Sequence, residues 1–164
     1  MYGRIFVIDN YPEIQHRGGL YELPWEPWEM KEWIPGCDYV TEAEDFEEDC
    51  EWFKQHFHIS DDQCSFVNLK DVDGETHAVF EVSVEPVLSA LREYKKRRLE
   101  EIKREIQKDD PQMWKIRWLA WDSRFWFAWE QSLDTEMGFL EYLQRLKKEN
   151  TEKILVIQSY NYHF

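Results

Sequence analysis

The residues best suited to catalysis lie near the start of the chain, where Asp9 precedes His16 and Arg17. A carboxylate and an imidazole can exchange protons with a reacting group, and the stretch "HRGG" could hold a phosphate through backbone N–H groups and a cation. These residues favour, as one hypothesis, a small phosphate-ester hydrolase or nuclease-like enzyme. The GKS, GxSxG, HExxH and GxGxxG patterns are absent, and a turn explains an Asp and a Gly pair equally well. We therefore assign no catalytic residue and keep this enzyme as an alternative.

Two cysteines and two histidines, Cys50, His56, His58 and Cys64, have the side chains that bind zinc. Their spacing matches neither CxxC nor HxxxH, and Cys50 falls on the apolar face of an expected helix. A core thiol with two loop histidines explains them better. We predict no metal site and no cofactor.

The densest charge in the chain is "TEAEDFEEDCEWF", residues 41–53. Lys54 is the only base between Ile34 and Lys70, although mixed Lys and Glu would solvate a helix better through i,i+4 pairs. The stretch is either the solvated face of a helix or a surface that imitates the phosphates of a nucleic acid. Its seven carboxylates are Glu42, Glu44, Asp45, Glu47, Glu48, Asp49 and Glu51.

The net charge of −14 is concentrated in the first half of the chain. Residues 1–91 contain 21 acids and 5 bases, whereas residues 92–164 contain 13 acids and 15 bases. Nucleic acids and anionic membranes repel so acidic a protein. We expect no direct nucleic-acid or membrane partner. The basic stretch 92–108 is either a solvated helix face or a docking surface.

Composition indicates a folded, cytoplasmic protein of 164 residues, 43% of them hydrophobic and 16% aromatic. Three cysteines without CxxC spacing favour free thiols in a reducing compartment. The first ten residues lack the pattern of a signal peptide, and no apolar run is long enough to span a bilayer.

The expected elements begin with a strand over residues 3–9 and a short helix within 24–36. A capping box at Thr41 and Glu44 would open the acidic helix, whose apolar face carries Phe46, Cys50, Phe53 and Phe57 at steps of three and four. Asp73-Gly74 predicts a hairpin of strands 64–71 and 75–84.

A long helix follows from Pro86, and then an aromatic helix with Asp110 as its N-cap and Pro111 as its first residue. A helix capped by Asp134 and a terminal strand complete the chain. The aromatic helix should be mostly buried, because it is apolar on several faces. The sequence predicts a single α+β domain, residues 1–164, with a small, mostly antiparallel sheet packed against several helices. The aromatic residues expected to be buried are Trp114, Trp118, Trp121, Phe125 and Trp129.

These features favour an acidic protein-binding module that inhibits or regulates a basic nucleic-acid-handling protein, as a nucleic-acid mimic, immunity protein or anti-defence protein would. The seven carboxylates would meet the basic partner, with Trp25 and Trp28 as aromatic anchors. A third hypothesis is a structural adaptor or homodimer, in which the acidic half meets the basic helix.

Overall fold

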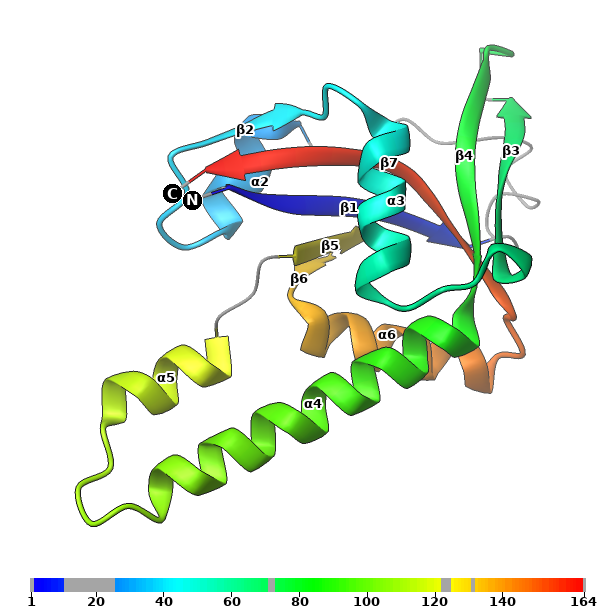
Figure 1. Ribbon diagram of the computed structural model, residues 1–164. Coiled ribbons are helices and arrows are strands. Elements are labelled where there is room, and N and C mark those ends of the chain that lie inside the picture. Colours follow the sequence, from blue (N-terminus) through cyan, green and yellow to red (C-terminus); the bar gives the residue numbers. More distant parts are fainter. Residues whose placement is uncertain (1, 11–25, 71–72, 122–124, 131, 164) are drawn as a thin grey trace.

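The computed structural model describes residues 2–10, 26–70, 73–121, 125–130 and 132–163 (Figure 1). The elements are β1 (Tyr2–Asn10), α2 (Pro27–Trp33), β2 (Tyr39–Glu42), α3 (Phe46–His56), the short 3-10 helix η1 (Asp61–Gln63), β3 (Cys64–Lys70), β4 (Thr76–Ser83), α4 (Val84–Ile106), α5 (Met113–Trp121), β5 (Phe125–Trp129), β6 (Ser132–Asp134), α6 (Glu136–Lys148) and β7 (Lys153–His163).

A seven-stranded sheet forms the centre of the fold. Six strands follow the order β3-β4-β7-β1-β5-β6, and β2 pairs with β7 outside this order. The long strand β7 pairs with β1 along one side, and with β4 and then β2 along the other. Only β1 and β5 pair in parallel among these strands, so the sheet is mostly antiparallel. The α+β class is confirmed, as are the N-terminal strand, the central hairpin and the C-terminal strand.

Both faces of the central strands are buried, because successive side chains of a strand point to opposite faces. Phe6 and Ile8 of β1 join a core with α3, α4 and α6. Ile5 and Val7 join a second core with Met30 of α2. Helix α2 therefore covers one face of the sheet, and α3 covers the other (Figure 1).

The hairpin of β3 and β4 turns at Gly74, whose φ of 86° lies in the left-handed region that glycine adopts without steric cost. This turn is the one that Asp73-Gly74 predicts. Its position fixes the register in which Cys64 opposes Val82.

The aromatic helix was predicted wrongly. Residues 114–129 are divided between α5 and the strand β5, and the buried aromatic side chains are those of the strand. Phe125 and Trp129 are 8% and 9% exposed, whereas Trp114 and Trp118 of α5 are 67% and 53% exposed. The side chain of Trp121 lies outside the described residues.

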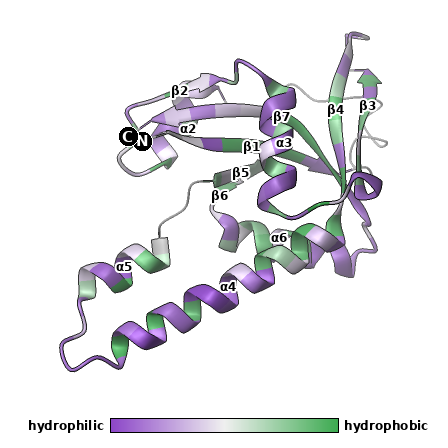
Figure 2. Ribbon diagram, in the orientation of Figure 1, coloured by the Kyte–Doolittle hydropathy of each residue, from purple (hydrophilic) through white to green (hydrophobic). Residues whose placement is uncertain are grey.

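The C-terminal half of α4 and all of α5 form an arm that projects from the body of the molecule (Figure 1). We use "the arm" for residues 92–121. Hydrophobic and hydrophilic residues are mixed along it, as Figure 2 shows. Its exposed large apolar side chains are Leu99, Ile106, Met113, Trp114 and Trp118.

Candidate protein-binding surface

Helix α3 begins one turn later than the sequence predicts. Its N-cap is Asp45, whose Oδ1 accepts a hydrogen bond from the backbone N–H of Glu48 at 3.0 Å. Thr41 cannot serve as the cap, because it belongs to β2 and pairs with Asn161 of β7. The predicted apolar face is otherwise correct, since Cys50 and Phe53 are fully buried against the sheet.

Most of the predicted carboxylates lie on the surface. Within the part of the chain that the structure describes, five of them form no ion pair with a lysine or arginine: Glu42, Glu44, Asp45, Glu47 and Glu48. Glu51 lies 3.5 Å from the Nζ of Lys54, which also binds Asp61. That contact to Asp61 raises the pKa of Lys54 and lowers the pKa of Asp61. The outer face of α3 therefore carries a largely uncompensated negative charge.

Asp49 is the exception, because its side chain is buried beneath α3. Its Oδ1 accepts a hydrogen bond from the Nε of Arg4 in β1 at 2.6 Å, and the residue is only 3% exposed. Its Oδ2 has no hydrogen-bond partner among the described residues. Asp49 therefore attaches α3 to the sheet and cannot contact a partner in this structure.

Glu42 also lies apart from the other acids. It pairs across the sheet with Tyr160, which packs in the core beneath α2. Burial, together with the smaller effects of the charges of Glu42 and Glu26, raises the pKa of Tyr160 to about 12. Because paired residues share a face of the sheet, Glu42 lies on the α2 side while the acids of α3 lie on the other.

The predicted anchor Trp28 does not flank the acidic helix. Trp28 is 61% exposed on α2, which covers the opposite face of the sheet from α3. Trp25 lies outside the described residues. The prediction missed Trp52, which is 51% exposed on α3 itself. Its position next to Glu51, off the apolar face, is the signal that could have identified it.

Among the residues that the structure describes, the acids of α3 form no ion pair with the basic stretch of α4. Within the same described residues, the ion pairs formed by bases of the arm join acids of the arm, such as Arg98 with Glu101 at 3.6 Å, whereas Glu85 in the first turn of α4 pairs with Lys147 of α6. Lys108 and Lys115 both bind the buried Glu105, and the contact to Lys108 lowers the pKa of that carboxyl. The two oppositely charged regions are therefore separate surfaces of one molecule.

The alternative catalytic residues are not brought together by the described structure. Asp9 is buried at the end of β1, where its Oδ1 accepts a hydrogen bond from the backbone N–H of Asn10 at 2.8 Å. His16 and Arg17 lie outside the described residues. The enzyme hypothesis stays a prediction.

The four candidate metal ligands also occupy different environments. Cys50 is buried in the main core, and burial raises the pKa of its thiol. The Sγ of Cys64 donates to the carbonyl of Ser60 at 3.5 Å. Among the described residues, no three His, Cys, Asp or Glu side chains are grouped so that they could hold a metal ion.

No protein-family model, curated protein or solved structure matches this chain. Among the described helices, none combines the length and the hydropathy that crossing a bilayer requires. Function must therefore be inferred from the surfaces themselves.

Proposed function

We propose that this protein binds a basic, nucleic-acid-handling protein through the acidic face of α3, and thereby inhibits or regulates it. The observation that carries the proposal is the row of exposed carboxylates at Glu44, Asp45, Glu47 and Glu48, which have no cationic partner within the described chain. A phosphate-binding surface presents the complementary charge.

The physical effect is electrostatic steering. Opposite charges raise the association rate of two proteins, and salt shortens the range of that attraction to about 8 Å at physiological ionic strength. The helix adds rigidity, because the Asp45 cap and the Arg4–Asp49 ion pair fix the first turn of α3 on the sheet. The carboxylates are therefore presented in a fixed geometry.

The test uses charge reversal on α3 with a matched control elsewhere. We expect the double variant Glu47→Lys/Glu48→Lys to lose basic proteins that the tagged wild-type chain retains from cell extract. The double variant Glu149→Lys/Glu152→Lys makes the same change in charge at two exposed residues after α6 and should retain them. Quantitative mass spectrometry at low and high salt measures which proteins each double variant retains.

Thermal unfolding should be nearly unchanged in both double variants, because exposed charges contribute little to stability. Equal sets of bound proteins from the two variants would contradict a specific role for α3. Retention of acidic and basic proteins alike would contradict the charge argument.

A homodimer is the second candidate, and the arm favours it. Five large apolar side chains are exposed there, and contiguous exposed apolar surface commonly marks a protein interface. The arm also contains more bases than acids, so it could meet the acidic face of a second copy.

Sedimentation equilibrium of the purified wild-type chain tests this candidate. We expect a dimer at low salt that dissociates as salt rises, and a monomer for Trp114→Ala/Trp118→Ala. A wild-type monomer at low salt and high protein concentration would exclude the homodimer without affecting the heterologous proposal.

A further inference from the structure

A groove runs between α3 and α4 and has two lobes. One lobe, of about 590 Å³, lies at the C-terminal end of α3, beside the first turns of α4. The other, of about 520 Å³, lies between the middle of α3, α4 and the start of β5. His56 and Tyr94 line both lobes and form the waist between them. Both volumes are in the range of small-molecule sites.

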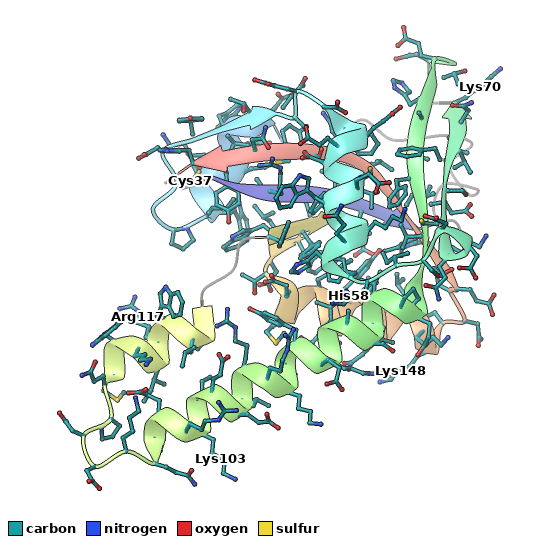
Figure 3. All side chains as sticks on the ribbon, in the orientation of Figure 1. Cys37, His58, Lys70, Lys103, Arg117 and Lys148 are labelled. Atoms are coloured by element: carbon teal, nitrogen blue, oxygen red, sulfur yellow. The ribbon has the colours of Figure 1, made fainter. Side chains whose placement is uncertain are left out.

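The first lobe is lined by one arginine and by the imidazoles of His56 and His58. Arg97 of α4 is exposed and, within the described chain, forms no ion pair. His58, two residues after the end of α3, lines the same lobe. Figure 3 shows His58 at this end of α3, above α4. Gln63 and Ser89 add hydrogen-bonding groups, and Glu93 is the acid of this lobe.

His58 adopts an uncommon backbone conformation for a residue other than glycine. Its φ is 53°, in the left-handed region that usually favours Gly or Asn after a helix. Such backbone conformations cluster at functional sites and persist where the surrounding structure holds them in place. The side chain of His58 lines the groove.

The second lobe is aromatic with a few polar groups. Trp52 is half-exposed at the edge of this lobe. The ring centroids of His56 and Phe125 lie 4.3 Å apart. Arg98 donates from Nε to the hydroxyl of Tyr94 at 3.0 Å. The amide of Gln55 and the buried carboxylate of Glu136 complete the lining. An aromatic wall with an amide and a carboxylate suits a planar base that carries an amino group.

We propose that this groove binds a nucleoside monophosphate. The phosphate would lie in the first lobe against Arg97 and His58, and the base would stack on Trp52 in the second, with Gln55 and Glu136 beside its polar edge. Trp52 and His56 lie four residues apart on α3, about 6 Å along the helix axis, and His58 lies beyond the end of the helix, so the two lobes together extend over roughly the length of a mononucleotide. A longer nucleic acid would meet the repulsion of the whole chain, at a net charge of −14.

Isothermal titration calorimetry with AMP, GMP, CMP and UMP tests the inference directly. We expect at least one of them to bind once per chain with a Kd on the order of 10 to 100 µM, the range that the usual affinity per atom gives for a ligand of this size. Adenosine and inorganic phosphate, each alone, should bind at least tenfold more weakly than the matching mononucleotide. No binding by any of the four below 1 mM would overturn the proposal.

The variant His58→Gly separates binding from folding. Glycine adopts a φ of 53° without strain, so the substitution should leave stability equal or higher while weakening binding at least fivefold. Trp52→Ala should weaken binding at least tenfold. The pair Arg97→Ser and Arg104→Ser removes an exposed arginine from α4 inside and outside the groove, and only the first should weaken binding.

Equal binding by wild type, His58→Gly and Trp52→Ala would place the nucleotide elsewhere and contradict the inference. If phosphate binds as tightly as the mononucleotide, the groove is a simple anion site and the proposal of a nucleotide site is wrong. Neither outcome depends on the acidic face of α3, so this inference stands or fails apart from the proposed protein partner.

Discussion

Replacement of Phe127 by Ala is expected to lower the free energy of unfolding by ~3–5 kcal/mol, whereas replacement of Trp114 by Ala should change it by less than ~0.5 kcal/mol. Phe127 lies at the centre of β5 and is 0% exposed. Its ring stacks on Phe139 at 4.1 Å between centroids, and Phe57 is 6.0 Å away. Removal of the ring would leave a cavity where these aromatic side chains meet.

Urea unfolding followed by circular dichroism measures both changes. Because ~5 kcal/mol can exceed the stability of a small domain, Phe127→Leu provides a second variant with a smaller loss. Trp114→Ala is the matched control, because both residues lie in one aromatic stretch of the sequence and only their structural settings differ. Similar losses for Phe127 and Trp114 would mean that the stretch is buried as a whole, as the sequence predicts, and would contradict the division into α5 and β5.

This division shows where the sequence pattern reaches its limit. Trp114, Trp118, Phe125 and Trp129 occur at helical steps, but Phe125, Phe127 and Trp129 also occur at the strand period of two. Short apolar runs do not distinguish a buried strand from a buried helix. The decisive factor is non-local: β5 pairs in parallel with β1, more than a hundred residues earlier in the chain.

Local patterns predicted the hairpin, the acidic helix and the two terminal strands, but not the short strands β2 and β6. Asp73-Gly74 specified the hairpin turn, and the spacing of Cys50, Phe53 and Phe57 specified the buried face of α3. The N-cap of α3 was predicted at the wrong residue, because Thr41 and Asp45 are both good N-cap residues. Only the pairing of β2 with β7 decides between them.

The sequence predicted only part of the candidate surface, because local spacing gives exposure but not contacts between distant residues. The exposure of Glu47 and Glu48 follows from their helical spacing on α3. The burial of Asp49 follows partly from its position one turn before Phe53, but its partner Arg4 is 45 residues away on another element. The groove between α3 and α4 could not be predicted, because no sequence spacing relates His58 to Arg97 or Trp52 to Phe125.

The stability of the wild-type protein is expected to fall as the pH is lowered from about 6.5 to 4 because of His56. Burial, together with the smaller effects of the charges of His58 and Arg97, lowers the pKa of this imidazole to about 4. The ring packs between Phe57 and Phe125, where a positive charge would lose its water. The unfolded chain has the ordinary histidine pKa of about 6.5.

The sign of the effect follows from the protons bound in each state. Above pH 6.5 the imidazole is neutral in both states, so its contribution to stability is fully present. Between pH 6.5 and 4 the unfolded chain binds a proton that the folded protein does not, and the free energy of unfolding decreases by up to ~1.4 kcal/mol per pH unit. The total loss from this group is roughly 3 kcal/mol, reached as the pH falls through the folded pKa of about 4.

The variant His56→Gln isolates this contribution from the many carboxylates that titrate over the same range. Urea unfolding at half-unit pH steps should give a shallower decline for the variant between pH 6.5 and 4, with the two curves parallel above pH 7. The comparison uses the pH slope rather than the absolute stability, because the substitution also removes the ring contact with Phe125. If wild type and variant decline in parallel throughout, the imidazole is protonated equally in both states. That result would show that His56 is hydrated in the folded protein and that the waist of the groove is open to water.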